Sequence, residues 1–309
     1  MRRSLRGALA ICIAASLWGL DGVVLTPRLH NLDVLFVVFL LHFVPFVILQ
    51  PFFLSSYKAL RTLSPSEWFT LALVALCGGI VGTYSIVKAL FLVNFNQLSV
   101  VVLLQKLQPV FAILLAAILL NERVSKRFLA WACLAIAGAY LLTFGLTIPQ
   151  TESGSSSTRA ALWASLAAAA FGCSTVLGKK LLNSLDYRQA TFARYGATTV
   201  FGLIALIASG LGLPIVEVTR TDWILIVAIG LTTGSGALFL YYWGLSWVPA
   251  RVAAICELCL PLSAVGLDYA INGSVLGAWQ WVGAAALILA ILKVTLGPKP
   301  PARVVPAAT

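Results

Sequence analysis

Two residues of opposite charge stand inside strongly apolar stretches of this sequence. Lys106 lies in the apolar segment 97–119, and Glu257 lies in the apolar segment 249–271. Each segment is long enough to cross a membrane, where a central charge costs roughly 2.5–3.5 kcal/mol unless it is paired or faces water. We expect a hydrated site in which Lys106 binds a carboxylate and Glu257 binds an ammonium group of one solute. The alternatives are that the two side chains neutralise each other, or that neither of them reaches a cavity.

The segment around Lys106 also carries a row of side-chain amides. At 100° per residue the amides fall within about 80° of one helix face. They are Asn94, Gln97, Gln105 and Gln108. Gln105 matches Glu257 when the second half of the sequence is laid over the first at an offset of 152 residues, so Gln105 is a candidate for the same site. Amides also join helices to one another inside membranes, so the row alone does not define a solute path.

Three further ionisable residues lie in apolar segments, namely Asp21, His42 and Arg194. The carboxyl group of Asp21 either exchanges a coupling proton or faces solvent at the end of the first segment. His42 is a site candidate, although a single histidine in a helix is more often a hydrogen-bonded packing residue. Arg194 stays charged and therefore needs a partner, and we expect Asp186 or a lipid headgroup within reach of its flexible side chain.

Aromatic residues divide into two groups by their position in the apolar segments. Trp18 and Tyr84 lie deep in their segments and are candidates for walls that stack on an apolar or aromatic solute. Tyr241, Tyr242 and Trp243 lie near the end of a segment. We predict that this second group anchors the chain at the membrane interface.

The composition makes this chain an integral membrane protein. Of its 309 residues, 61% are hydrophobic and only 10% are charged, which leaves too little polar surface for a soluble protein of this size. The net charge of +11 lies mainly in short loops without an aromatic-interleaved basic face, so we expect no nucleic-acid partner. Its partners are expected to be the lipid bilayer and a small-molecule substrate, and the sequence does not indicate an oligomeric state.

The apolar residues fall into about ten runs of membrane-spanning length. We predict an all-α membrane protein with helices at 7–26, 33–54, 67–89, 97–119, 127–146, 160–181, 187–210, 221–244, 249–271 and 276–295. A serine-rich stretch at the midpoint is typical of a flexible linker. The predicted organisation is a first five-helix unit (1–146), the linker (147–159), a second five-helix unit (160–296) and a cytoplasmic tail (297–309).

The lysines and arginines predict how the chain is oriented. If the N-terminus is cytoplasmic, fifteen of the twenty-one basic residues lie on the cytoplasmic side, four lie on the opposite side and two lie within helices. This asymmetry follows the positive-inside rule. We expect a multi-pass protein of the bacterial inner membrane with both termini in the cytoplasm.

The second half of the sequence repeats the first weakly. Trp18-Gly19 matches Phe171-Gly172 at an offset of 153 residues, and Pro109 matches Pro261 at 152. Each unit has five helices, an odd number, so the second unit must cross the membrane in the opposite direction to the first. Inverted repeats of this kind are typical of secondary transporters, in which two related halves alternate in their exposure to either side.

Three segments resemble a known family. Ala15-Ser-Leu-Trp-Gly19, Leu107-Gln-Pro-Val-Phe111 and Leu120-Asn-Glu-Arg-Val124 are similar to motifs of the EamA-type, ten-helix members of the drug/metabolite transporter superfamily. The resemblance covers nearly the whole chain. It implies a central cavity lined by helices one to four and six to nine, with helices five and ten at the periphery, and the export of amino acids, metabolites or toxic organic compounds. The glutamate of the third motif, Glu122, has no counterpart near Ser274 and is therefore expected to be structural.

The expected function is secondary transport, most directly the export of amino acids or related metabolites by alternating access. An exporter of drugs or organic cations with the same fold, and a channel or lipid scramblase, are the alternatives. An enzyme is not expected, because the sequence has no HExxH, GxSxG or P-loop motif. The Cys256-Cys259 pair has no second pair, so neither a metal nor another cofactor is predicted.

Overall fold

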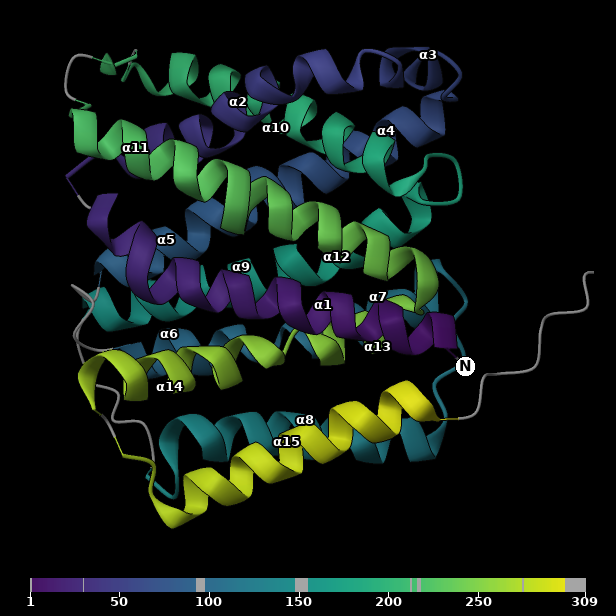
Figure 1. Ribbon diagram of the computed structural model, residues 1–309, viewed down its shortest axis with the longest axis vertical. Coiled ribbons are helices and arrows are strands. Elements are labelled where there is room, and N and C mark those ends of the chain that lie inside the picture. The colour runs from purple at the N-terminus through teal and green to yellow at the C-terminus, as the bar shows by residue number, and fades with distance from the viewer. Residues whose placement is uncertain are drawn as a thin grey trace, which may run out of the picture.

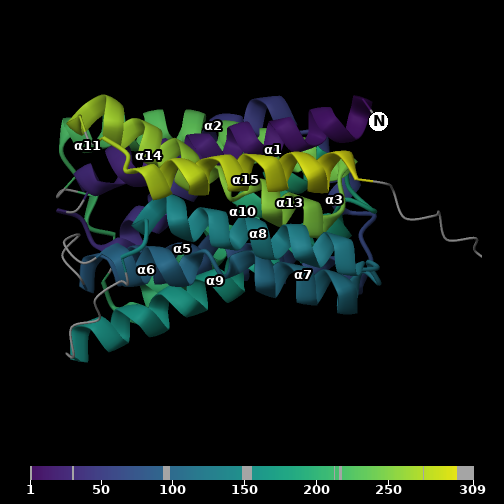
Figure 2. The same ribbon diagram turned by 90° about the horizontal axis from the view of Figure 1, so that it is seen from below.

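The chain folds into a bundle of helices that run roughly parallel to one another (Figures 1 and 2). This computed structural model describes residues 2–29, 31–92, 98–147, 155–211, 213–215, 218–273 and 275–297, and these ranges contain helices and turns but no strand. Nine stretches of helix in these ranges are long and apolar enough to cross a membrane, and Leu103–Leu119 is a shorter apolar helix. The predicted all-α fold with ten membrane-spanning segments is confirmed.

The first five spans are formed by the following elements. They are α1 (Arg2–Leu20) with η1 (Asp21–Leu25) and η2 (Thr26–Leu29), α2 (Val34–Phe53), α4 (Pro65–Val74) with η3 (Ala75–Val81) and α5 (Gly82–Leu92), α6 (Leu98–Gln105) with α7 (Gln108–Leu119), and α8 (Lys126–Phe144). The short helix α3 (Ser56–Leu60) connects α2 to α4.

The other five spans repeat this order. They are α9 (Ser155–Leu181), α10 (Tyr187–Ser209), α11 (Arg220–Ile229) with η5 (Gly230–Gly234) and α12 (Ser235–Trp247), α13 (Ala250–Cys256) with α14 (Cys259–Asn272), and α15 (Ala278–Leu296). The helix α9 begins five residues before the predicted start at 160. Of the predicted linker, residues 148–154 lie outside the described residues.

The fourth and ninth spans, predicted at 97–119 and 249–271, are each interrupted by a short turn at corresponding positions. The first break lies between α6 and α7, ahead of Pro109, and the second lies between α13 and α14, ahead of Pro261. Proline lacks a backbone N–H and clashes with the carbonyl group four residues earlier, which disrupts the α-helix at that point. Backbone bonds to the third preceding residue replace the helical pattern, including Leu107 N–H to Leu104 and Leu258 N–H to Ile255.

The third and eighth spans also share a local irregularity. The stretches η3 and η5 have the wider π-helical hydrogen-bonding pattern, and their first residues, Ala75 and Gly230, are separated by 155 residues. This offset is the one at which the sequences of these spans match. Such π-helical insertions are rare and are frequent at functional sites.

The two halves interlock through their first helices. In the first half α1 packs against α12 and α14, and in the second half α9 packs against α5 and α7. The first helix of each half therefore contacts the third and fourth spans of the other. The helices α8 and α15 pack against each other at the lower edge of the molecule in Figure 1, which agrees with the peripheral placement that the family resemblance implied.

Two polar contacts join the halves at opposite ends of the bundle. The Asn31 side chain donates to Asp222 over 3.2 Å at the start of α11, and the Ser184 hydroxyl donates to Glu67 at the start of α4. Both acidic residues also close capping boxes, with Ser64 and Thr219 as the N-cap residues. The contacts are equivalent under the repeat, and they lie at opposite ends because the second half is inverted.

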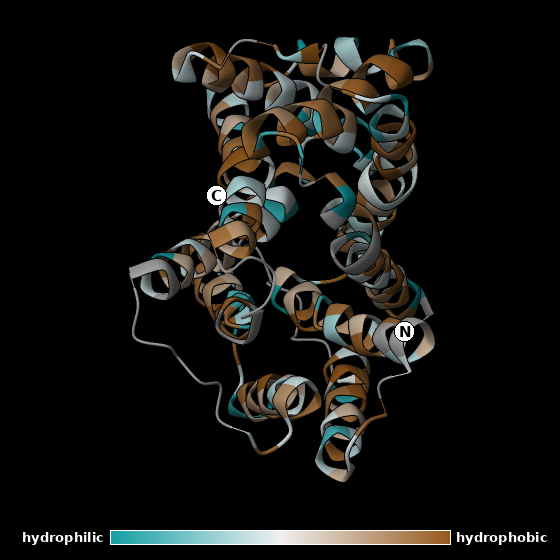
Figure 3. Cartoon of the chain, turned by 90° about the vertical axis from the view of Figure 1, so that its left-hand side faces the viewer, coloured by the Kyte–Doolittle hydropathy of each residue, from teal (hydrophilic) through white to brown (hydrophobic). Residues whose placement is uncertain are grey.

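The surface of the bundle suits a hydrocarbon environment. Hydrophobic residues dominate the helices when the bundle is viewed along their axes (Figure 3). Large apolar side chains are exposed on the outside, including Phe52, Ile207 and Trp281. In water such a surface would be unfavourable, whereas in a bilayer it contacts lipid chains.

A substitution at Gly172 tests how closely α9 packs against the break in the fourth span. A Cβ atom added at Gly172 would lie 3.0 Å from the backbone oxygen of Gln108, just as one at Gly19 would lie 3.0 Å from that of Leu260. We expect Gly172→Ala to destabilise the fold by about 1–3 kcal/mol through overpacking. Thermal unfolding of the detergent-solubilised protein measures this effect.

The matched control is Gly266→Ala in α14, where an added Cβ meets nothing within 4 Å. This control is expected to unfold at or slightly above the wild-type temperature, because alanine favours a helix over glycine. Equal melting temperatures for the two variants would contradict the close packing of α9.

Candidate functional site

Glu257 lies at the break in the ninth span and accepts hydrogen bonds from three other helices. Its Oε1 accepts from the hydroxyl of Tyr241 on α12 over 2.7 Å and from that of Thr175 on α9 over 3.1 Å. Its Oε2 accepts from the side-chain amide of Gln108 on α7. We call these four residues the central network. The network joins the broken fourth span of the first half to three spans of the second half.

Aromatic rings extend the central network toward α1 and α10. The Trp18 ring lies 5.2 Å from the Tyr241 ring, and the Tyr241 ring lies 5.9 Å from that of Tyr242. Both tyrosines are buried, so the prediction that they anchor the chain at the membrane interface is wrong. That prediction assumed that α12 ends near these residues, but α12 continues to Trp247 and places them inside the bundle.

Arg194 is buried beside the aromatic group, and no carboxylate of the described ranges forms an ion pair with it. Its Nη1 donates to the Tyr242 hydroxyl over 3.4 Å, and its guanidinium carbon lies 5.8 Å from the centre of that ring. Its Nε has no partner among the described residues. A Cβ atom at Gly78 would collide with Arg194, so the π-helical stretch of the third span leaves room for the guanidinium. The expected partner, Asp186, instead caps α10 through the backbone N–H groups of residues 188 and 189.

His42 and Asp21 make local contacts near this aromatic group. The Nδ1 atom of His42 lies 2.8 Å from the carbonyl oxygen of Val38, and the His42 ring lies 5.3 Å from the Tyr195 ring. Asp21 accepts a hydrogen bond of 2.8 Å from the Thr26 hydroxyl within the irregular end of the first span. Neither side chain hydrogen-bonds to the central network in the part of the chain that the structure describes.

Lys106 lies in the break of the fourth span. This break corresponds to the break of the ninth span, in which Glu257 lies. Its side chain is 7% exposed, and the only ion pair within 4 Å among the described residues joins Arg251 and Glu122. The structure therefore does not contain the Lys106–Glu257 pair that was the alternative to solute binding. Gln105 is half-buried at the end of α6, and Gln108 rather than Gln105 contacts Glu257. The amides Asn94 and Gln97 lie outside the described residues.

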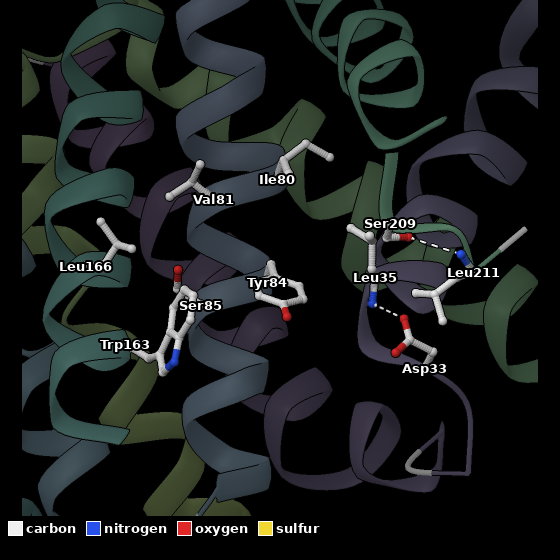
Figure 4. A pocket seen from close by; sticks show the side chains of 10 residues that line it. All are labelled: Asp33, Leu35, Ile80, Val81, Tyr84, Ser85, Trp163, Leu166, Ser209 and Leu211. Carbon is white, nitrogen blue, oxygen red and sulfur yellow. Dashed lines mark hydrogen bonds between the residues drawn. The ribbon is translucent and has the colours of Figure 1, made fainter. Parts of the chain in front are cut away.

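Tyr84 lies apart from Trp18, in a separate cavity of about 380 Å³. Its ring meets the edge of the Trp163 ring at a centroid distance of 5.7 Å. Figure 4 shows Tyr84 between Trp163 on α9 and Asp33, which precedes α2. Asp33 and Ser209 mark the beginning of α2 and the end of α10, so this cavity lies at the end of the bundle opposite the N-terminus.

Charged side chains join helix termini at the end of the bundle that carries the N-terminus. Glu122 accepts from the backbone N–H groups of Ala250 and Arg251 at the start of α13 and pairs with the Arg251 guanidinium over 3.0 Å. Lys179 donates to the carbonyl oxygens of Leu245 and Ser246 near the end of α12. These charges compensate the partial charges at the helix ends, which supports the structural role expected for Glu122.

The described side chains do not form a recognisable metal centre. Within the described ranges, no three or more His, Cys, Asp and Glu residues are arranged to hold a metal ion. The arrangement instead offers aromatic rings, hydroxyl and amide groups, one carboxyl group and one guanidinium. Such a set suits reversible binding of an organic solute through stacking and hydrogen bonds.

The matching family profile and a similar known protein both indicate a membrane transporter. The profile of the EamA-like transporter family matches residues 5–144 and 158–296, and the chain belongs to this family. It is 46% identical over 297 residues to the "Riboflavin transporter ImpX" of Fusobacterium nucleatum subsp. nucleatum, covering 96% of this chain and 99% of that protein. The protein is thus a multi-pass membrane transporter of small molecules.

Two more distant matches support the fold. The "Uncharacterized transporter YwfM" of Bacillus subtilis (strain 168) is 27% identical over 202 residues, which is 62% of either chain. A solved crystal structure superposes with a TM-score of 0.73 at 17% identity, and the match covers 96% of both chains. At that identity the structural match establishes the shared fold alone.

Thr175 and Tyr241 are the members of the central network that the sequence did not single out as site residues. Thr175 lies three residues after Gly172, which matches Gly19 in the first half, and Tyr241 lies in an aromatic cluster. Threonine inside an apolar helix commonly bonds to its own backbone, so its type alone gives no signal. The repeat alignment would have drawn attention to Thr175, because residues near a matched glycine share its close helix contact.

Substitutions in the Arg251–Glu122 pair test how much this ion pair contributes to the stability of the fold. Its side chains are only 8% and 11% exposed, so removing one partner leaves a buried charge unpaired. We expect Glu122→Ala to reduce the free energy of unfolding by about 3 kcal/mol. The double variant Glu122→Ala/Arg251→Ala should lose less than the sum of the two single variants.

Chemical or thermal unfolding in detergent micelles measures the stability of the wild type, the two single variants and the double variant. Arg123→Ala, an exposed neighbour, serves as the control and should unfold like the wild type. Strictly additive losses would show that the two side chains do not interact.

Proposed function

We propose that this transporter moves riboflavin across the membrane. The observation that carries the proposal is the 46% identity to a riboflavin transporter over nearly the full length of both proteins. At this similarity the helices and most side chains around a central site are expected to correspond. The amino-acid export expected from the sequence is therefore the second candidate rather than the first.

The chemistry of the central network supports a flat heterocyclic solute. Riboflavin has a planar three-ring system with a polar imide edge and a ribityl chain rich in hydroxyl groups. The half-buried ring of Trp18, which packs on Tyr241, offers a stacking surface, and Gln108, Thr175 and Glu257 offer hydrogen-bonding groups near it. The buried guanidinium of Arg194 supplies donors of the kind that carbonyl oxygens of the imide accept.

Amino-acid transport retains one specific observation in its favour. Lys106 and Glu257 do not form an ion pair with each other, so each charge is available to the opposite charge of a zwitterion. The two candidates differ in what the central network must recognise, namely a ring system or a pair of charges. Competition between the two kinds of solute separates them.

We further propose that the protein resides in the bacterial inner membrane with both termini in the cytoplasm. The asymmetry of lysine and arginine supports this orientation. The start of α1 and the end of α15 lie at the same edge of the bundle in Figure 1, as an even number of spans requires. Labelling of single cysteines at exposed loop positions in intact cells tests the orientation.

Counterflow in proteoliposomes tests riboflavin transport directly. Vesicles that contain the purified protein and unlabelled riboflavin should take up labelled riboflavin transiently, and excess external riboflavin should saturate the uptake. Trp18→Ala should raise the half-saturating concentration about tenfold, since the loss of an aromatic contact of about 1.4 kcal/mol corresponds to that factor. Trp279→Ala, an exposed residue of α15, is the control and should behave like the wild type.

Three results would redirect the assignment. Counterflow with amino acids but not with riboflavin would favour the second candidate, and counterflow with organic cations alone would indicate a drug exporter. Rapid, non-saturable equilibration without counterflow would indicate a channel. Any of these outcomes would contradict riboflavin transport.

A further inference from the structure

Three oxygen atoms of the central network form a closed triangle. The Thr175 hydroxyl lies 2.9 Å from the Tyr241 hydroxyl, which lies 2.7 Å from Oε1 of Glu257, and Oε1 lies 3.1 Å from the Thr175 hydroxyl. We call these atoms the oxygen triangle. Every side of the triangle is short enough for a hydrogen bond, and a side without a proton would place two lone-pair-bearing oxygens in direct contact.

A count of protons shows what the oxygen triangle requires. Each hydroxyl group supplies one proton, so Thr175 and Tyr241 together fill two of the three sides. An ionised carboxylate only accepts and supplies none. With Glu257 ionised, one side would bring two lone-pair-bearing oxygens together without a proton between them. With Glu257 protonated on Oε1, Oε1 donates to one hydroxyl and accepts from the other, and the Thr175 and Tyr241 hydroxyls share the third side, so that all three sides are filled.

The second carboxyl oxygen of Glu257 is consistent with this assignment. Oε2 accepts from the Gln108 amide, as the carbonyl-type oxygen of a protonated carboxyl group does. No cation lies within ion-pair distance of Glu257 in the described chain. A buried carboxylate without a paired cation is costly, and a neutral carboxyl group avoids this cost.

None of the charged groups on the surrounding elements forms an ion pair with Glu257 in the described chain. Arg194 on α10 exerts an electrostatic effect on Glu257 but makes its contact with Tyr242. Lys179 on α9 bonds to backbone carbonyl oxygens of α12, and Arg251 on α13 pairs with Glu122. Further titratable groups on these elements include Tyr242 on α12, Cys12 on α1, Cys173 on α9, Cys256 on α13, Cys259 on α14, Lys293 on α15 and Lys106 in the break of the fourth span.

We propose that Glu257 binds the coupling proton of this transporter, holds it on Oε1 in the oxygen triangle, and thereby links solute movement to a proton gradient. The inference rests on the transport function proposed above. It also replaces Asp21, the residue that the sequence suggested for this role, because Asp21 hydrogen-bonds only to Thr26 nearby within the described residues.

The coupling step is a simple proton transfer. When the site opens to one side, a water molecule takes the proton from Oε1, the O–H bond of Glu257 breaks, and a carboxylate and a hydronium ion form. Only two protons then remain for three oxygen–oxygen contacts, so one contact loses its hydrogen bond. Because Thr175 lies on α9, Tyr241 on α12 and Glu257 at the end of α13, the loss of the proton weakens the contact among three helices at the break. Protonation from the other side reverses the step.

Glu257→Gln is the decisive variant, because its amide nitrogen supplies a permanent third proton at the position of Oε1. Wild-type protein in proteoliposomes, with the membrane potential clamped, should accumulate riboflavin under one polarity of pH gradient and lose it under the other. One coupled proton supports a ratio of up to about tenfold per pH unit. Glu257→Gln should raise the half-saturating riboflavin concentration, because Glu257 also belongs to the central network, and the counterflow measured at saturating riboflavin should be equal under both polarities.

The matched control is Glu67→Gln, which removes a carboxylate charge at the edge of the bundle and keeps a side chain able to close the capping box. It should retain the wild-type response to the pH gradient. Wild-type counterflow without any effect of gradient polarity, or a gradient response that survives in Glu257→Gln, would overturn the proposal. An absence of riboflavin counterflow in the wild type would instead contradict riboflavin transport.

Infrared spectroscopy tests the proton itself without any transported solute. The wild-type protein in lipid nanodiscs at neutral pH should show the carbonyl absorption of a protonated carboxyl group, and Glu257→Gln should lack this absorption. Tyr241→Phe, which removes one oxygen from the triangle, should shift the band. If the wild-type and Glu257→Gln spectra are identical in this region, Glu257 does not hold a proton.

Discussion

The interior of a bilayer contains no water to satisfy polar groups, and this constraint accounts for the arrangement of the bundle around its two broken spans. A helix that breaks inside a membrane frees backbone groups, which persist only where protein or a hydrated cavity surrounds them. Here both breaks lie inside the bundle, covered by α9 in one case and by α1 in the other. The glycines at these crossings, Gly172 and Gly19, let the covering helices approach the broken backbone.

Because the two halves are inverted repeats, each half contains one broken span that is covered in the same way. Two equivalent halves of this kind are what alternating access requires. Breaks in the fourth and ninth spans, π-helical stretches in the third and eighth, and polar contacts at opposite ends all occur in corresponding pairs. The side chains in the two breaks nevertheless differ, because one break carries Lys106 and the other carries Glu257. The scaffold is therefore symmetric whereas its chemistry is not, and the hydrogen-bonded carboxyl group belongs to one half.

Much of the fold could be predicted from the sequence, because membrane spans are defined by local composition. Apolar length, the positions of the basic residues and the Trp18-Gly19 match were sufficient for ten spans in two inverted halves. Pro109 and Pro261 indicated a disruption of the fourth and ninth spans but not its form, since a proline inside a membrane helix produces either a kink or an interruption depending on its neighbours. The extension of α12 to Trp247 was missed because Trp243 and Gly244 resemble the end of a span.

The candidate site was predictable only in part, since partners depend on which helices meet. Glu257 and Trp18 were identified as unusual for their depth in apolar segments, and both lie in or beside the central network. The contacts of Glu257 with Thr175 and Gln108 join residues 82 and 149 positions apart, and no local pattern encodes them. The same limit explains why Asp186 was expected beside Arg194 although it caps a helix.

The central claim is that the region around Glu257 is a solute site that opens to each side of the membrane in turn. The most direct measurement uses Thr175→Cys in a background without native cysteines and a membrane-impermeant thiol reagent applied to either face of oriented vesicles. We expect this cysteine to react from both faces and riboflavin to slow both reactions, as a solute site that opens to each side requires. Reaction from one face alone, or labelling that riboflavin does not affect, would contradict this claim.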